Sequence, residues 1–387
     1  TSAVQQHPLP MPHRDPGAMT HLCSDDLIAL IRVFLGTLSP AGLPAELNGE
    51  ALLDEARKTG TVALLFHHPA APCFPDDFRQ ALKRSYIAAT AHYARLAKSL
   101  STLCAEFHRR GIDAVPFKGI GLSQRLFGDI AFRSCTDHDI LVKKAQAREA
   151  LQVLLDLGFQ LSLHLPPAEA ADSLERFYSI ELRHPENKVL VDLQWDIANG
   201  YAPPPLREEA LFQRTMPLSI LGQPVPFFDD AVTLYLLCIH GAKNAWCELR
   251  ALLDLAMMIK VFPGPVWRET AEWLEAQGLP AAMTTGVLLA HQLLGVSLPE
   301  AAAARVDWRA RRLAAAIQSH WRKKGSERPS AWQRFVWDLR FREGLREKTR
   351  YLLFRLRPTR TDWRSQGQAA PLLYLKRFGR IFLPKPS

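Results

Sequence analysis

Residues 132–142 read FRSCTDHDILV, and they place two carboxylates, Asp137 and Asp139, at the start of an apolar run. Side chains two positions apart on a strand leave the same face, so both acids would point the same way. Two ionised carboxylates repel each other, and a divalent cation between them removes that cost; Mg²⁺ or Mn²⁺ suits such oxygen ligands. The D-x-D spacing alone is weak evidence, because a loop that ends in polar residues produces it too.

Three neighbouring features favour a metal site that serves phosphates. Lys118-Gly119 ends an apolar run and opens a helix, where backbone N–H groups and the lysine can meet a phosphate. Arg133, just before the acids, could reach a phosphate across the metal. Asp192 interrupts the apolar run VLVDLQW and would be a third carboxylate on a neighbouring strand, costly to bury unless it is paired or metal-bound. Asp196 is the alternative third acid.

Simple structural roles explain other polar residues near these motifs. Arg250 and Asp254 are four apart on one predicted helix, which predicts an ion pair between them. His138 would face away from the two acids on a regular strand. Cys135 has no basic neighbour placed to activate its thiol, so we expect it to be structural.

The hydrophobic pattern predicts an α+β protein with helices before and after a short mixed sheet. The leading segment is Pro-rich and is expected to be a disordered leader or an expression remnant. The predicted parts are this leader (1–24), a helical region (25–110), a core with short strands (111–228), a second helical domain (229–300) and a basic helical region with a tail (301–387).

Composition excludes several classes of protein. Of 387 residues, 48% are hydrophobic and 22% charged, and no apolar stretch is long enough to predict a membrane span. The six cysteines lack C-x-x-C spacing, which argues against a zinc knuckle and a disulfide framework. Reduced thiols in the cytoplasm are the simplest expectation.

The basic charge is concentrated in the last part of the chain. From residue 301 onward there are 22 Lys and Arg against 6 Asp and Glu, whereas the whole chain carries +9. Two interpretations give this region an anionic partner: nucleic acid bases that stack on tryptophans, or an anionic lipid surface. A plain solvated surface is the third interpretation. The tryptophans concerned are Trp321, Trp332, Trp337 and Trp363.

Three stretches together carry a family resemblance: KGIGLSQRLFGDIAFRSCTDHDILV, VLVDLQW and HGAKNAWCELRALLDLA. They resemble the uncharacterised nucleotidyltransferase family of the polymerase-β-like superfamily. The resemblance implies that fold, with Gly119 and Lys118 at a triphosphate, Asp137 and Asp139 on metal ions, and Asp192 as the acid that activates an acceptor hydroxyl. It also implies transfer of a nucleotide with release of pyrophosphate.

The sequence departs from the family pattern at two positions. Gln194 stands where the family usually has histidine, and Asn244 stands where a second histidine is common. The stretch HGAKNAWCELRALLDLA, which contains Asn244, is predicted to be helical. In it His240, Lys243 and Trp246 recur at spacings of three and would share a face. Lys243 would then meet a phosphate and Trp246 the base; alternatively this stripe only packs beside the core.

We therefore expect Mg²⁺-dependent (or Mn²⁺-dependent) transfer of a nucleotide, AMP from ATP or another NMP from its NTP, onto a hydroxyl of a peptide, protein or small molecule. The choice of ATP rests on cellular abundance and on no residue. One alternative is a non-catalytic nucleotide-binding or partner module, which Gln194 supports. Another is a glycosyltransferase that uses D-x-D, although the upstream Lys-Gly pair speaks against it.

Overall fold

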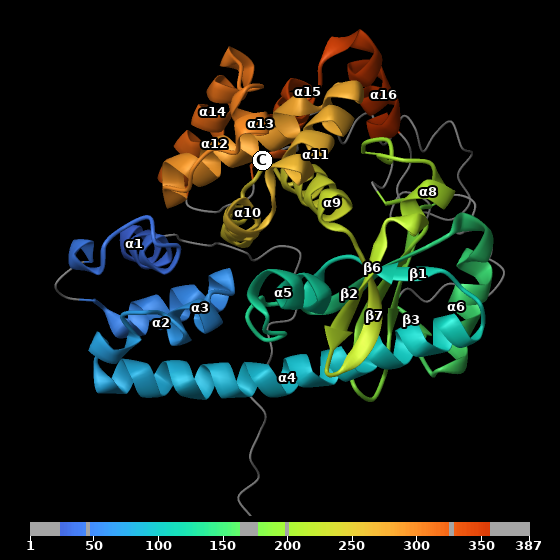
Figure 1. The fold of residues 1–387 in the computed structure, drawn as a ribbon, viewed down its shortest axis with the longest axis horizontal. Coiled ribbons are helices and arrows are strands. Elements are labelled where there is room, and N and C mark those ends of the chain that lie inside the picture. The colour runs from blue at the N-terminus through green and yellow to red at the C-terminus, as the bar shows by residue number, and fades with distance from the viewer. Residues whose placement is uncertain (1–23, 44–46, 163–176, 198–200, 325–328, 357–387) are drawn as a thin grey trace, which may run out of the picture.

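The computed structural model describes residues 24–43, 47–162, 177–197, 201–324 and 329–356, and combines a small mixed sheet with many helices (Figure 1). The α+β prediction is confirmed. The predicted leader up to residue 23 and the tail from residue 357, with Trp363, lie outside the described residues. No described helix combines the length and the apolarity that crossing a bilayer requires.

The N-terminal region is helical, as its pattern predicts. Ser24 caps the first helix by accepting a hydrogen bond from the Leu27 N–H. The long fourth helix stops just before Gly111, whose φ of +70° suits glycine and no continuing helix. The elements are α1 (Asp25–Phe34), η1 (Pro40–Gly42), α2 (Gly49–Thr59), α3 (Val62–Phe66), η2 (Ala71–Cys73) and α4 (Asp76–Arg109).

The central sheet has the strand order β1-β2-β5-β4-β3, and only its β2–β5 pair is parallel. A turn at residues 185–187 joins β4 to β5 as an antiparallel hairpin. The elements are β1 (Ala114–Pro116), α5 (Gly119–Phe127), β2 (Asp137–Val142), η3 (Lys144–Gln146), α6 (Ala147–Asp156), β3 (Gln160–Leu161), β4 (Ser179–Arg183) and β5 (Leu190–Gln194).

A separate two-stranded hairpin and a group of helices follow the sheet. In Figure 1 the later helices gather above the sheet and the N-terminal helices. The elements are α8 (Glu208–Gln213), β6 (Thr215–Ile220), β7 (Gln223–Phe228), α9 (Asp230–Lys243), α10 (Leu249–Val261), α11 (Gly264–Ala276), α12 (Pro280–Leu294), α13 (Glu300–Ala303), α14 (Trp308–Lys324), α15 (Ala331–Arg340) and α16 (Gly344–Leu356).

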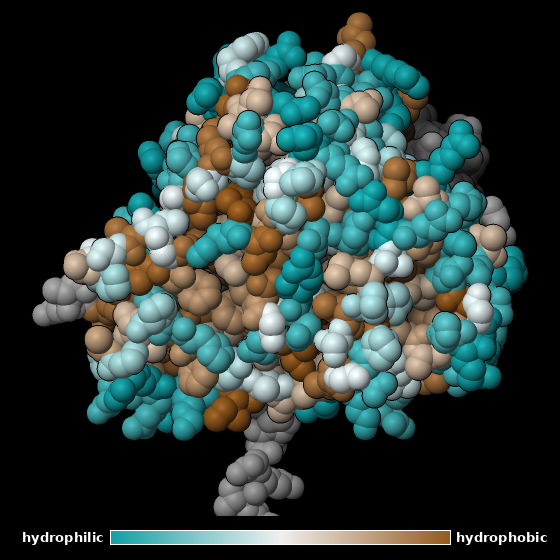
Figure 2. All heavy atoms as spheres, viewed as in Figure 1, coloured by the Kyte–Doolittle hydropathy of each residue, from teal (hydrophilic) through white to brown (hydrophobic). Residues whose placement is uncertain are grey.

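The sheet separates two hydrophobic clusters. Ile140 and Val142 of β2 belong to the cluster formed with α4 and α6, whereas Leu141 belongs to the larger one. That larger cluster runs from Leu27 in α1 to Tyr351 in α16, so the N-terminal and C-terminal helices share one core. On the face shown in Figure 2, hydrophilic side chains cover most of the C-terminal helices, and hydrophobic ones gather nearer the N-terminal helices.

Candidate active site

The three predicted acids lie on one face of the sheet. In the parallel β2–β5 ladder Asp139 stands directly opposite Asp192, and Asp137 stands two residue pairs before it, on the same face. The alternate residues Val191 and Leu193 are fully buried on the other face. The prediction that Asp192 occupies the neighbouring strand is therefore confirmed.

The acids are crowded enough to change their chemistry. Burial, and next the negative charge of Asp139, raise the pKa of Asp192 to about 7, although a hydrogen bond from Ser179 and the charge of Lys118 oppose the rise. A carboxyl whose ionised form is this unfavourable gains most from a nearby cation. The face between the two strands is thus a place where added positive charge is stabilising.

Gln194 bridges two of the acids. Its side-chain Nε2 donates hydrogen bonds to Asp139 Oδ1 and to Asp192 Oδ2, both at 2.8 Å, and the residue is buried. Lys118 Nζ lies 3.5 Å from the same Asp139 oxygen. As the side chains stand, no three His, Cys, Asp or Glu residues in the described part of the chain are close enough together to hold a metal ion.

The start of α5 reaches the same acids. Gly119 has φ of +56°, and a Cβ there would lie 3.3 Å from the Asp137 carbonyl oxygen, so glycine permits both the backbone conformation and the close approach. Lys118 stands at the N-cap and its side chain makes no cap hydrogen bond. The first N–H groups of a helix lack intrahelical partners, so this end of α5 is suited to an anion.

Basic side chains gather around His240 at the end of α9. Burial, followed by four nearby cations, holds the pKa of His240 well below its ordinary range, so the imidazole is neutral and accepts a hydrogen bond from Asn244 Nδ2 at 3.1 Å. Lys243 has a lowered pKa because of its burial and the charge of Lys118, against which Asp192 acts. The four cations around His240 are Lys118, Lys243, Arg250 and Arg133.

This placement puts positive charge beside the acidic face. The charges of Lys118 and Asp192 both act on the Lys243 ammonium group, so the side chain at the end of α9 lies within electrostatic range of the acids on the two strands. A triphosphate with a bound cation needs this pairing of carboxylates and basic groups. The neighbourhood of Lys243 is thus compatible with the phosphate role predicted for it.

The predicted role of Trp246 is wrong. Helix α9 ends at Lys243, and Trp246 adopts φ of +51° in the turn that follows, so the stripe of residues spaced by three does not continue. The indole is fully buried against Gly241 and Gly286, and its Nε1 donates to the Ala282 carbonyl at 3.1 Å. It packs the helical core and cannot contact a nucleotide base.

The predicted ion pair between Arg250 and Asp254 is also wrong. Asp254, 1% exposed, accepts a 2.8 Å hydrogen bond from Arg133 Nε instead. Arg250 donates to the Ser134 carbonyl at 2.9 Å and lies 3.6 Å from Glu248. The guanidinium of Arg133 thus anchors the loop before β2 to α10. Its predicted role as a phosphate ligand stays a prediction.

Three other polar residues lie on or near β2, β4 and β5. Asp196 follows β5 and lies outside the ladder with β2. It is near Tyr235, whose pKa is raised mainly by burial and to a smaller extent by the charge of Asp196. Glu181 on β4 stands opposite Asp192 and is exposed. The sequence interpretation missed this fourth carboxylate, which the alternation in FYSIELRH could have indicated. His138 is buried on the opposite face, as predicted, and burial lowers its pKa to about 4.

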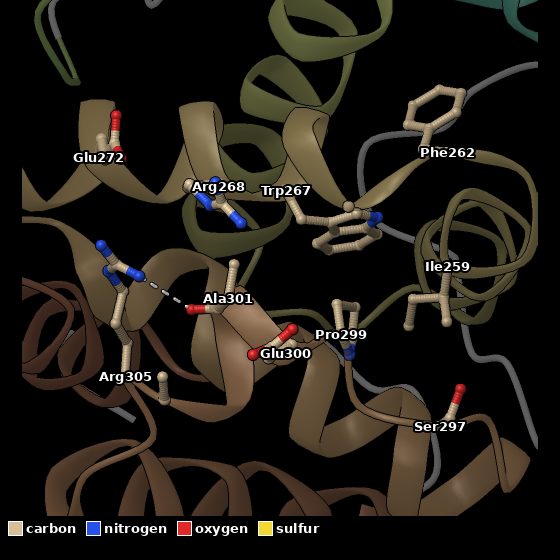
Figure 3. Close-up of a pocket in the computed structure, with 12 residues that line it drawn as sticks. Ile259, Phe262, Trp267, Arg268, Glu272, Ser297, Pro299, Glu300, Ala301 and Arg305 are labelled. Carbon is tan, nitrogen blue, oxygen red and sulfur yellow. Dashed lines mark hydrogen bonds between the residues drawn. The ribbon is translucent and has the colours of Figure 1, made fainter.

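A cavity of about 450 Å³ lies elsewhere, between α10, α11 and the segment around α13 (Figure 3). Trp267 and Phe262 lie on one side, and on the other Arg305 donates to the Ala301 carbonyl, four residues earlier in the same segment, at 3.1 Å. None of the predicted site residues lines it. Its Arg and Glu side chains have mixed charge, so it offers no defined preference for an anion or a cation.

A family model described as "Uncharacterised nucleotidyltransferase" matches residues 45–295. The chain belongs to this family. The matched region contains the three acids, the Lys118-Gly119 pair and Lys243, and the resemblance inferred from the sequence motifs is confirmed.

Comparison with individual proteins adds little. One similar solved structure is the crystal structure of an antigenic nucleotidyltransferase-like protein from Paracoccidioides brasiliensis, with 18% sequence identity. The match covers 48% of this chain and 91% of that protein's chain, with a TM-score of 0.31. No curated protein matches the chain.

Proposed function

We propose that this member of the nucleotidyltransferase family transfers a nucleotide, AMP from ATP, onto a hydroxyl of a peptide, protein or small molecule, using Mg²⁺ (or Mn²⁺). The observation that carries the proposal is the arrangement of Asp137, Asp139 and Asp192 on one face of β2 and β5, beside the N-terminus of α5 and the basic end of α9. Carboxylates next to basic groups serve metal-bound polyphosphate chemistry.

Carboxylate oxygens are the ligands that a hard divalent cation prefers, and the three acidic side chains would have to move closer together than they stand to hold one. Asp137 and Asp139 would hold it with Asp192, and crowding of these acids is what a cation would relieve. Gln194 can turn its amide oxygen toward the same point, because an amide carries both a donor and an acceptor. The bound cation would neutralise charge on the phosphate oxygens.

The chain's own residues would bind and orient the substrates. Gly119 and the first turn of α5 would receive the triphosphate, with Lys118 and Lys243 as point charges on its oxygens. The acceptor oxygen forms a bond to the α-phosphorus, the bond from that phosphorus to the bridging oxygen breaks, and pyrophosphate leaves. Asp192, opposite Asp139, would take the proton of the acceptor hydroxyl.

Gln194 favours a second candidate, a nucleotide-binding module without catalysis. Its amide donates to Asp139 and Asp192 in the position where a family histidine is usual. A protein of this kind would bind nucleotide with Mg²⁺ and release no pyrophosphate. A glycosyltransferase is less suited, because the sheet is small and mixed and only β2 and β5 run parallel.

The test supplies each α-labelled NTP with Mg²⁺ or Mn²⁺ and a lysate of the source cell to the wild type and to the double variant Asp137→Asn/Asp139→Asn. Label on an acceptor with the wild type alone supports the proposal and identifies both base and target. Equal labelling by both proteins would overturn the site assignment.

Two single variants then identify the third acid. Asp192→Asn is expected to abolish labelling, and Asp196→Asn is expected to leave it nearly unchanged. Nucleotide binding by calorimetry without label or pyrophosphate release would instead support the non-catalytic module.

The proposed location is the cytoplasm. Cys73, Cys104, Cys135, Cys238 and Cys247, the cysteines within the described residues, are all free. Free thiols are expected in a reducing compartment.

A further inference from the structure

A second concave surface, the C-terminal cleft, lies between α14, α15 and α16. It encloses about 500 Å³, a volume typical of pockets that bind small ligands. Its apolar lining includes Leu313, Phe335 and Leu339. Two tryptophans also line it, and both are largely exposed, Trp308 at 65% and Trp332 at 58%. Exposed indole rings in a concave site offer flat surfaces for stacking.

The charge of the cleft is entirely positive. Arg342 is held between the rings of Tyr201 and Tyr351, at 4.2 and 4.0 Å from their centroids, so one charge is fixed in place. Within the described residues no ion pair joins the other cations of the cleft to an acid, and no acid lines it. The lining cations are Arg309, Arg312, Arg340, Arg342 and Lys348.

Helix α15 lies between the C-terminal cleft and the end of α9. Trp332 and Phe335 of α15 line the cleft, whereas Arg334 donates to the Lys243 carbonyl at 3.2 Å. A helix with its side chains is about 10–12 Å across. A polymer bound in the cleft would therefore lie about one helix width from the basic end of α9.

We propose that the C-terminal cleft binds an unpaired stretch of nucleic acid. Bases would stack on Trp308 and Trp332, and phosphates would meet Arg312 and Lys348. Alternating aromatic platforms and unpaired cations are the means by which proteins bind single strands without reading sequence. A bilayer is a poorer partner, since these indoles lie in a concave site, and an acidic peptide would leave the ring faces without stacking partners.

The test is fluorescence anisotropy of a labelled single-stranded oligoribonucleotide with the full chain, across a series of salt concentrations. Arg312→Glu should weaken binding strongly, whereas Arg311→Glu, the adjacent exposed cation outside the cleft lining, makes the same charge change and should matter little. Trp332→Ala should cost about 1–3 kcal/mol, or about 5- to 150-fold in affinity. The control Leu345→Ala, at a residue that is 84% exposed and outside the lining, should leave the affinity unchanged.

Each outcome decides the proposal. Selective loss in the two cleft variants, with a linear fall of log affinity against log salt, supports it. Equal effects of Arg312→Glu and Arg311→Glu would mean diffuse charge attraction and would overturn it. So would absence of oligonucleotide binding, or binding only of poly-glutamate or of anionic vesicles. The assay needs no turnover, and Asp137→Asn/Asp139→Asn should bind like the wild type, so failure of the transferase proposal is distinguishable.

Discussion

The buried pair of Arg133 and Asp254 gives the sharpest prediction. Asp254 is 1% exposed and the Arg133 side chain 10% exposed, with 2.8 Å between Nε and Oδ2. Arg133→Met or Asp254→Leu leaves the other charge buried without its partner, which costs about 3–5 kcal/mol of unfolding free energy. The double variant should recover most of that loss, because replacing both charges by apolar groups is often neutral. Urea denaturation followed by circular dichroism measures all four proteins.

A matched control and a binding measurement make this prediction decisive. Asp54→Ala breaks the exposed pair with Lys58, in which 62% and 49% of the side chains are exposed, and should cost less than about 0.5 kcal/mol. If Arg133→Met changes stability by less than about 0.5 kcal/mol and yet abolishes nucleotide binding, Arg133 is a phosphate ligand and not an anchor. A double variant no more stable than either single variant would also refute the reasoning.

Three further predictions concern backbone, pH and metal. Gly119→Ala forces φ of +56° on a residue with a Cβ, so it should lower the free energy of unfolding by about 1–2 kcal/mol and also weaken nucleotide binding. The control Gly128→Ala, at φ of +68° with open space around it, should lower stability alone. Burial lowers the pKa of His68, and the neutral ring accepts a hydrogen bond at Nδ1 from the Ala70 N–H. Because the folded protein disfavours the protonated ring, the contribution of His68 to stability is complete above about pH 6.5 and falls on acidification. Urea denaturation at several pH values should show a flatter fall for His68→Gln. Mg²⁺ should raise the melting temperature of the wild type and not of Asp139→Asn, read by calorimetry.

Alternation along strands explains how much of the candidate site could be predicted. Asp137 and Asp139 share a face because strand side chains repeat every two residues, and Asp192 was expected on a neighbouring strand because its apolar neighbours alternate with it. The contact of Gln194 with Asp139 depends on the register between β2 and β5, which no local pattern specifies, whereas Asp192 is its neighbour two residues earlier on the same strand. The sequence showed only that an unusual residue stood there.

The amino-acid sequence alone determined the local elements: the helix that stops before Gly111, the strand that begins at the acids, and the Lys118-Gly119 opening of α5. Tertiary structure decided the partners. Arg133 pairs with a carboxylate 121 positions away instead of reaching solvent, and Trp246 turns into the helical core instead of continuing along α9. Periodicity reflects interactions between near neighbours, whereas these contacts arise only when α10 and α12 pack against distant segments and exclude water from charged and aromatic groups.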